Sequence, residues 1–274
     1  MPWTLSHPAA ILPLRRLCPV PLDFAALVIG SMTPDIGYYL RRFDLSQFAH
    51  SFPGSFLACL PTGVIMLCLF YFFCRPVCYA LPSPHREHLF PLCPEFPTSL
   101  RRWAILLISL LLGAWIHIFW DAFTHEFGWF VVRIPWLQEP VMQLGSTVIW
   151  RYLLMQELST LVGFAILLLA YRSWLRRQPA LDHAPDADSN RMRYWFWIVL
   201  LGLSLAVSFP PAVQFASSTH LQGFLFGRCV VFRTAIYSHA LVVPIVLLGT
   251  SILYRRRDRR LLRQLHQVRR LDRL

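Results

Sequence analysis

The chain of 274 residues contains no lysine and few charged side chains of either sign. Its 26 basic residues are therefore all arginines, set against 14 acidic ones, and charged residues make up only 15% of the sequence. Soluble domains are about one quarter charged, and they are less apolar than this chain, which is 56% hydrophobic with a mean hydropathy of +0.48. This composition excludes an ordinary soluble domain and is typical of a membrane protein.

Two other features are missing. No cleavable signal peptide is evident, because the start "MPWTLSHPAA" has no basic n-region and prolines interrupt the apolar residues after it. No internal repeat is visible, which favours a single membrane domain.

The seven cysteines are an odd number and most lie in or beside apolar runs. We therefore expect them to act as small apolar residues rather than as a disulfide framework.

Long apolar runs dominate the sequence. Five of them are long enough to cross roughly 30 Å of hydrocarbon as helices: residues 54–74, 103–123, 149–170, 194–216 and 234–254. The run 22–33 is too short to span and predicts a buried or re-entrant helix ended by Pro34. The expected fold is all-α, a polytopic membrane helical bundle of about five transmembrane helices plus a short re-entrant N-terminal helix.

The arginines are divided unevenly between the two sides of these runs. Segments 75–102, 171–193 and 255–274 hold eighteen, and the opposite side holds seven: Arg15, Arg16, Arg41, Arg42, Arg133, Arg228 and Arg233. By the positive-inside rule the richer side faces the cytoplasm, so the N-terminal segment and the 124–148 loop face outward. Arginines beside apolar spans favour anionic lipid headgroups, and not nucleic acid, as the partner.

The last segment, 255–274, has the pattern of an amphipathic helix. Its apolar residues fall near one helical face, and basic residues cover the rest: Leu261, Leu262, Leu265, Val268 and Leu271. We expect residues 1–254 to form the membrane domain and 255–274 to form a cytoplasmic tail that lies on the anionic inner leaflet.

The stretch "HIFWDAFTH" places ionisable groups at the outer end of the second span. His117, Asp121 and His125 are spaced i, i+4, i+8, so on a helix they share one face over about 12 Å. Such a pattern suits a central carboxylate that bridges two metal ions, with a histidine toward each. Bridged two-metal sites activate water for phosphoester hydrolysis. A helix-packing stripe is the alternative, but three ionisable groups in a span generally face a protein interior or a water-filled cavity.

Three further groups are expected on the same side of the membrane: His7 in "TLSHPAA", Asp35 in "GSMTPDIGYYL" and His50 in "FAHSF". Each alone is a weak signal, since a Ser-His or Pro-Asp pair is usually a capped helix end or a turn. Imidazole and carboxylate together are a normal ligand set for zinc. Together with His117, Asp121 and His125, these three residues give six donors on one face of the membrane. We expect the metal site to be formed by the N-terminal half of the chain.

These stretches resemble a known family. "MPWTLSHPAAILPL", "LVIGSMTPDIGYYL", "FAHSF" and "GAWIHIFWDAFTHEFGW", in this order, look like the bacterial membrane family catalogued as domain of unknown function 4184. More loosely, the order His, Pro-Asp, His-Ser, His-x-x-x-Asp resembles predicted membrane-bound metal-dependent hydrolases. It is also similar to the zinc-dependent phospholipase C and nuclease group, an all-helical trinuclear-zinc fold.

The resemblance implies a main metal bound by Asp35, His50, His117 and Asp121. It implies a second metal at His7 and the bridging Asp121, and a third at His125. The chain has neither the free amino-terminus nor the later His-x-x-x-Glu pair of the secreted phospholipases, so we expect one or two ions, of zinc. Asp35, His117 and Asp121 are the expected catalytic residues. The implied activity is hydrolysis of a phosphoester in a phospholipid or lipid-linked substrate at the outer boundary of the bacterial inner membrane.

Other interpretations stay open. Glu157 in the third span is either a carboxylate near the site or a partner for Arg151. Arg133 and Arg151 either hold a substrate phosphate or extend to lipid headgroups. Gln156 and the lone His239 are expected to be helix-packing residues.

Two other classes of protein also remain. One is a non-catalytic membrane protein with a structural metal. The other is a transporter, although "WAILLISLLLGAWI" offers only Ser109 as a polar residue along a path beside the second span.

Overall fold

The computed structural model describes the chain except residues 1–2, 15–20, 145–146, 182–186, 220 and 272–274, and it describes only the backbone of 187–188 and 257–271. The described residues are mostly helical, and five helices are long and apolar enough to cross a membrane: Phe52–Ala80, Leu100–Thr124, Arg151–Arg176, Ser189–Ser218 and Gly223–Arg256. The expected five-helix membrane fold is therefore confirmed.

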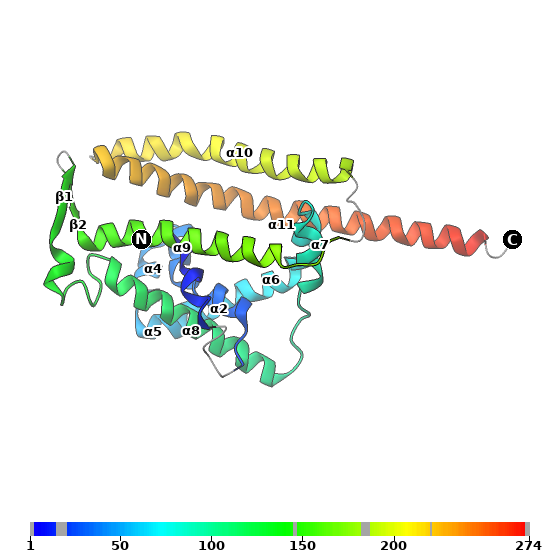
Figure 1. Cartoon of the computed structure of the whole chain (residues 1–274), viewed down its shortest axis with the longest axis horizontal. Helices are drawn as coiled ribbons and strands as arrows, with labels where there is room; N and C mark the ends of the chain where they lie inside the picture. Colours follow the sequence, from blue (N-terminus) through cyan, green and yellow to red (C-terminus); the bar gives the residue numbers. More distant parts are fainter. Residues whose placement is uncertain (1–2, 15–20, 145–146, 182–186, 220, 272–274) are drawn as a thin grey trace.

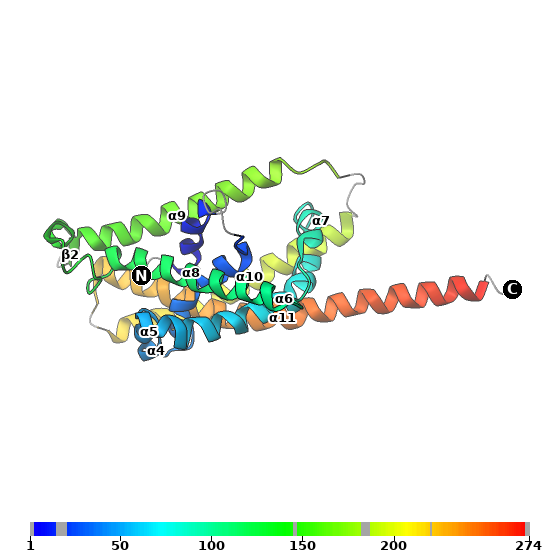
Figure 2. The same ribbon diagram turned by 90° about the horizontal axis from the view of Figure 1, so that it is seen from below.

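The long helices lie roughly parallel (Figures 1 and 2). Helix α10 (Ala187–Ser218) and helix α11 (Gly223–Leu271) form an antiparallel pair, and α11 also packs on α6 (Leu60–Ala80). Helix α6 continues backwards through the π-helical turn η3 (Ser55–Cys59) and α5 (Phe52–Gly54) and contacts α8 (Leu100–Thr124). Helix α9 (Arg151–Arg176) packs mainly on the N-terminal segment, and it also contacts α8 and, through Arg228, α11.

The N-terminal segment fills the space between the long helices. The 3-10 helix η1 (Thr4–Ile11) packs on α9, and helix α2 (Phe24–Gly30) packs on α8 and α6. The carboxylate of Asp23 begins α2 by accepting a hydrogen bond from the Ala26 N–H. The short helix predicted over 22–33 is thus present and buried, but it ends at Gly30. Pro34 instead lies within the next turn, η2 (Thr33–Asp35).

Two glycines allow α2 and α8 to touch backbone to backbone. A Cβ on Gly30 would lie 2.1 Å from the Leu110 carbonyl oxygen, and one on Gly113 would lie 2.2 Å from that of Leu27. Small residues at a crossing are the usual way for membrane helices to approach so closely. The contact fixes α2 against α8 one turn before His117 and so positions the site described below.

The remaining short elements lie in the connections. Helices α3 (Ile36–Tyr39) and α4 (Phe43–Ala49) follow η2, and α7 (His85–Leu89) and η4 (Phe90–Leu92) lie between α6 and α8. After α8 come η5 (Pro135–Gln138) and an antiparallel hairpin of β1 (Pro140–Leu144) and β2 (Thr147–Trp150). The hairpin was not expected, and because β2 takes up residues 147–150, the third span begins at Arg151 and not at 149.

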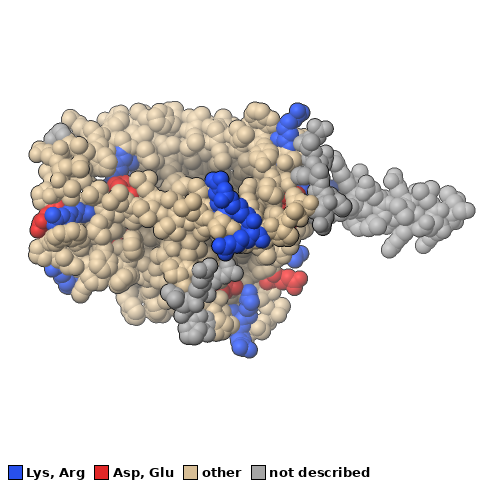
Figure 3. All heavy atoms as spheres, in the orientation of Figure 1, with Lys and Arg blue, Asp and Glu red and all other residues tan. Residues whose placement is uncertain are grey.

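The outer surface fits a lipid environment. Most of the face shown in Figure 3 carries no charged side chain, and many large apolar side chains are exposed, including Leu161, Leu169 and Leu203. Helix α11 continues unbroken past residue 254 to Leu271 (Figure 1). The side chains expected to form the apolar face of the tail lie outside the described residues, so the amphipathic surface tail stays a prediction. Arg15, Arg16 and Cys18 also lie outside the described residues. The six cysteines that the structure describes are free thiols.

Candidate metal centre

Four of the six expected ligands form one compact group. Asp35 is the last residue of η2, His50 follows α4, and His117 and Asp121 lie one turn apart on α8. One ligand atom of each lies within 4.8 Å of those of the other three. Asp35 and His117 are completely buried and Asp121 almost so. Residues from three separate segments therefore direct acidic and imidazole groups at one buried point.

The shortest distances in this group are those expected between ligands of one ion. His117 Nε2 lies 3.2 Å from Asp121 Oδ2 and 3.5 Å from Asp35 Oδ1. His50 Nε2 lies 3.3 Å and 3.7 Å from the same two oxygens. The two Nε2 atoms are 3.2 Å apart.

Both imidazoles are oriented by backbone carbonyls. His117 Nδ1 lies 2.7 Å from the Ser31 carbonyl oxygen, and His50 Nδ1 lies 2.7 Å from that of Ser46. Because a carbonyl oxygen only accepts, each Nδ1 carries a proton, and each ring directs its Nε2 at the centre. A second-sphere carbonyl on Nδ1 is the usual partner of a metal-binding histidine.

The Asp35 carboxylate is also held by a neighbour outside the centre. Its Oδ2 accepts a hydrogen bond of 2.6 Å from the Thr4 hydroxyl, while among the described residues its Oδ1, which faces the histidines, is buried without a hydrogen-bond partner. Four atoms converge on the centre: one Nε2 from each of the two histidines and one oxygen from each of the two aspartates. A proton could bridge only one pair of these atoms, whereas a single metal ion could bind all four. The donor set therefore fits a metal ion.

Burial and the nearby charges act in opposite directions on Asp35. Burial raises the pKa of this carboxyl, but the nearby charge of His117 lowers it by more, so the net shift of the pKa is downward. The ionised carboxylate, which is the form that binds metal, is therefore the favoured state of Asp35.

His7 lies beside this group. Its Nε2 is 3.6 Å from Asp121 Oδ1, the oxygen that faces away from His50 and His117. Its ring stacks on that of His117 with a centroid distance of 3.6 Å. Burial lowers the pKa of His7 to about 3, so its imidazole is neutral at ordinary pH. Asp121 thus offers one oxygen to the main group and the other to His7.

His125 also reaches Asp121, but in a different way from that expected. Helix α8 ends at Thr124, and His125 is its extended C-cap residue, with φ −111° and ψ 143°. The helical spacing i, i+8 therefore does not apply. His125 Nε2 lies 3.6 Å from Asp121 Oδ2, the same oxygen that His117 approaches. The expected arrangement, with a histidine of this trio on each side of the carboxylate, is wrong, because His7 takes that second side.

The centre opens toward one side. The side chains of His50 and His125 are 22% and 29% exposed, whereas those of His7, His117 and both aspartates are nearly inaccessible. Burial lowers the pKa of His125, so this partly exposed imidazole is neutral at ordinary pH. The side of the centre lined by His50 and His125 is therefore its most accessible side.

The lesser candidates lie elsewhere. Glu157 and Gln156 both accept hydrogen bonds from Arg228 of α11, at 2.6 Å and 3.0 Å. Of the two alternatives left open for Glu157, the structure shows neither: Glu157 pairs with Arg228, and Arg151 pairs with Glu139. Gln156 bonds across helices as expected.

Two more side chains have their own partners. Arg133 lies over the Trp129 ring, 4.2 Å from its centroid. His239 donates to the Ala235 carbonyl and packs on Trp3 and Tyr39, as expected for a packing residue.

The fold and the centre define a multi-span membrane protein with a buried His/Asp cluster that could hold a metal ion. Residues 1–250 match the family described as "Domain of unknown function (DUF4184)", and the chain belongs to that family. No curated protein and no solved structure matches it. The family resemblance seen in the sequence is thus confirmed, and no relative supports the relation to metal-dependent hydrolases.

Some contributors to the centre could not be found from sequence. Thr4 lies three residues before His7, and that spacing could have drawn attention to it as a partner of the site. The carbonyls of Ser31 and Ser46 have no sequence signal, because any residue supplies the same atom.

Proposed function

We propose that this protein is an integral membrane metal-dependent hydrolase that cleaves a phosphoester in a lipid or lipid-linked substrate. The observation that carries the proposal is the convergence of four lone-pair acceptors, the Nε2 atoms of His50 and His117 and one oxygen each of Asp35 and Asp121. On the orientation predicted from the arginines, the centre lies at the outer boundary of a bacterial inner membrane.

Zinc is the ion that suits this ligand set best. Ligands 2.0–2.1 Å from a tetrahedral zinc lie about 3.3 Å from one another, and the distances above range from 3.2 to 3.7 Å. Two imidazoles favour zinc over magnesium and calcium, which prefer oxygen ligands. Very little movement of Asp35, His50, His117 and Asp121 would therefore be needed to bind the main ion.

A second ion would lie on the other oxygen of Asp121. Asp121 Oδ1 and His7 Nε2 are 3.6 Å apart, and among the described residues both atoms are buried without a hydrogen-bond partner. His125 Nε2 is likewise unpartnered and lies on the more exposed side. The second position has fewer protein ligands than the first, so it is the one with room for water or substrate.

The roles of the residues follow from these positions. Asp35, His117 and Asp121 would hold the main ion, with Asp121 also bridging to the second. When bound, such ions lower the pKa of water and stabilise charge on phosphoryl oxygens. His125, neutral and partly exposed, is placed to exchange a proton at the open side of the centre.

A lipid substrate is supported by the surroundings of the opening. Trp129 and Trp136, which follow α8, are more than half exposed. Arg133 and Arg151 cover their rings, at 4.2 Å and 4.6 Å from the centroids. Exposed tryptophans with arginines mark the headgroup region of a bilayer. The opening of the centre at His125, at the end of the same helix, would therefore meet phosphate-bearing headgroups.

The test combines metal analysis with a substrate panel. Elemental mass spectrometry on detergent-purified protein should find one or two zinc ions per chain, and Asp121→Asn and His117→Ala should lose them, while the control His239→Ala keeps them. Metal-loaded wild type should then cleave at least one member of a panel of phospholipids and lipid-linked phosphates. Absence of metal from gently purified protein, or no cleavage across the panel, would overturn the hydrolase assignment.

A structural metal is the second candidate, and one observation favours it. Asp35, His50, His117 and Asp121 already supply the four ligands of a closed tetrahedral site, which is typical of structural zinc. If this candidate is correct, a chelator should lower the melting temperature strongly and no substrate should be cleaved. If the hydrolase proposal is correct, chelation should abolish cleavage and metal addition should restore it.

A further inference from the structure

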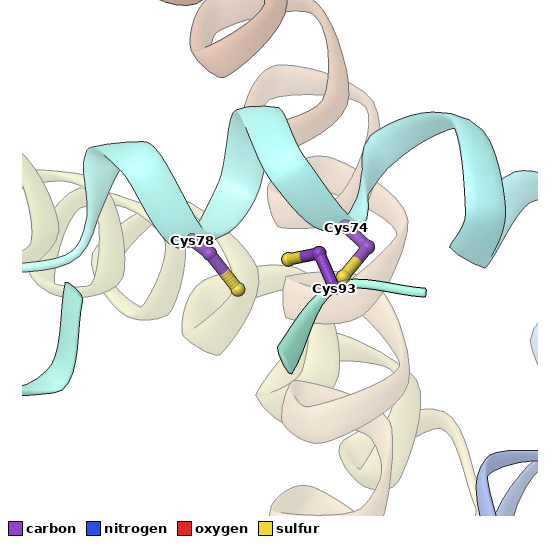
Figure 4. Close-up of side chains that lie close together, drawn as sticks. All are labelled: Cys74, Cys78 and Cys93. Atoms are coloured by element: carbon purple, nitrogen blue, oxygen red, sulfur yellow. The ribbon is translucent and has the colours of Figure 1, made fainter. Parts of the chain in front are cut away.

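Three cysteines converge at the far end of α6. Cys74 and Cys78 lie one turn apart on this helix, and Cys93 approaches them from the connection that follows η4 (Figure 4). Their Sγ atoms all lie within 4.8 Å of one another. Cys93 is buried and the other two are half-buried. Sequence spacing does not suggest this cluster, since fifteen residues separate Cys93 from Cys78.

The connection that carries Cys93 is held on α6 from both sides. Before it, Phe90 packs on Tyr254, which also contacts Tyr79 of α6. After it, Phe96 packs on Tyr71 and Phe72, with ring centroids 5.5 Å and 5.9 Å apart. Cys93 is therefore placed against the cysteine face of α6 by contacts that do not involve sulfur.

An ion pair also joins α6 to the connection that carries Cys93. Arg75 follows Cys74 on α6, and its Nη2 lies 3.9 Å from an oxygen of Glu95, two residues after Cys93. The guanidinium thus lies between the two segments that carry the thiols. A positive group there would offset part of the negative charge that three thiolates bring to a metal.

The geometry suits a metal better than a disulfide on α6. Side chains at i and i+4 of a helix have Cβ atoms about 5–6 Å apart, whereas a disulfide needs Cβ atoms about 3.5–4.5 Å apart. Cys74 and Cys78 therefore cannot be bridged without distorting α6. Thiolates around one zinc, at about 2.3 Å, lie about 3.8 Å from each other. The observed separations require only a small contraction.

The cysteine cluster is separate from the His/Asp centre. Helix geometry puts Cys74 about 33 Å along the helical run that begins at Phe52, next to His50. The two groups therefore lie at opposite ends of the spans. On the predicted orientation the cysteines are at the cytoplasmic end, where thiols stay reduced.

We propose that Cys74, Cys78 and Cys93 form a three-thiolate site for a soft, thiophilic metal ion of the class of Cu(I) and Zn²⁺. Thiolates select such ions over magnesium, calcium and manganese. Binding replaces the three thiol protons with the metal, and these protons pass to solvent. The bound ion would join the connection after η4 to the end of α6. This site does not depend on the proposed hydrolase activity.

The probe is Cd²⁺ added to full-length protein purified in detergent with reduced thiols. We expect one Cd²⁺ per chain with ultraviolet sulfur-to-cadmium charge-transfer absorption. Cys93→Ser and Cys78→Ser should each reduce that absorption by more than half. Cys229→Ser, which removes a half-buried thiol outside the cluster, should leave it unchanged, as should Asp121→Asn, which alters only the other centre.

Two further measurements make the result decisive. Circular dichroism should show that the cysteine variants keep the wild-type helix content, and Cys93→Ala repeats the test without a hydroxyl. Cu(I), which thiolates bind more tightly than Cd²⁺, should then displace Cd²⁺, as measured by the loss of protein-bound cadmium. The proposal is overturned if reduced wild type shows no charge-transfer band, if the band survives in Cys93→Ser and Cys93→Ala, or if mass spectrometry of protein purified under reducing conditions finds two of these cysteines joined as a disulfide.

Discussion

The Nε2 atoms of His50 and His117 lie 3.2 Å apart, although each ring has its Nδ1 proton bound to a backbone carbonyl. In the metal-binding form of the rings, with neither Nε2 protonated, the two lone pairs would repel each other unless a cation lay between them. The rings are fixed by Ser46 and Ser31, so the arrangement does not depend on the ion for its orientation. Such preorganisation of ligands by their second sphere is what a metal site requires.

Substitutions of His50 and His7 should affect the binding of different ions. Cobalt(II) in a tetrahedral site absorbs strongly in the visible region, so the first equivalent added to metal-free Cys93→Ser protein, in which the cysteine cluster is disabled, should produce that spectrum. We expect His50→Ala to abolish it, because it removes a ligand of the main ion. His7→Ala should preserve the spectrum and reduce total binding by about one ion. An unchanged spectrum in His50→Ala would contradict the four-ligand assignment.

The hydroxyl of Thr4 should tune the affinity of the centre. It donates a 2.6 Å hydrogen bond to Asp35 Oδ2 and so fixes the carboxylate with Oδ1 toward the histidines. Loss of such a second-sphere bond typically weakens metal binding about 10- to 100-fold. We expect Thr4→Val to show that decrease in competition with a chelator, and Thr4→Ser, which keeps the hydroxyl, to stay near wild type. Equal metal affinities for Thr4→Val and Thr4→Ser would show that the Thr4 hydroxyl does not contribute to metal binding.

The contact between Gly113 and the Leu27 carbonyl should couple packing to metal binding. In Gly113→Ala the new methyl group would meet backbone at 2.2 Å, so α2 and α8 must separate and carry Ser31 away from His117. We expect a loss of about 1–3 kcal/mol in stability and a more than tenfold loss in metal affinity. The measurements are the melting temperature and chelator competition.

Gly202→Ala is the matched control for that substitution. Gly202 also lies within a spanning helix, but in the described part of the chain nothing lies within 4 Å of the position that a Cβ would take there. It should therefore leave metal affinity unchanged and alter stability by less than about 1 kcal/mol. If Gly113→Ala behaved like Gly202→Ala, the close approach of α2 and α8 would not be what positions the centre.

The spans and the donors were predictable because their signals are local. A run of about 20 apolar residues identifies each crossing helix without any knowledge of its neighbours. The donors stand out because ionisable side chains such as Asp121 and His117 carry a free-energy cost within an apolar run, so they usually face a protein interior and have a functional role. What brought His7, Asp35 and His50 into the same prediction was their shared side of the membrane and the family resemblance.

The details that were missed depend on chain geometry or on distant contacts. His125 faces the same carboxylate oxygen as His117 because α8 stops one residue earlier, and the pattern "DAFTHEFG" gave no clear stop. Strands β1 (Pro140–Leu144) and β2 (Thr147–Trp150) pair with each other, although the sequence pattern predicts a loop over 140–148 and a helix over 149–150. The alternation in "PVMQLGSTVIW", with Gly-Ser between two apolar segments, was the available signal. Cys93 reaches α6 through aromatic packing that no spacing rule predicts.

The pair Glu157–Arg228 should act in helix packing and not in the metal centre. The Arg228 Nε lies 2.6 Å from Glu157 and its Nη2 lies 3.0 Å from Gln156, so the guanidinium joins α11 to α9. We expect Glu157→Gln to keep full metal content. In a double-mutant cycle with Arg228→Met, measured by thermal unfolding, the coupling between the two should be about 0.6 kcal/mol, the average for polar contacts between membrane helices, and no more than about 1.7 kcal/mol, the largest value found. A Glu157→Gln variant that lost metal would instead place this carboxylate in the centre, and a coupling near zero would show that the pair contributes nothing to packing.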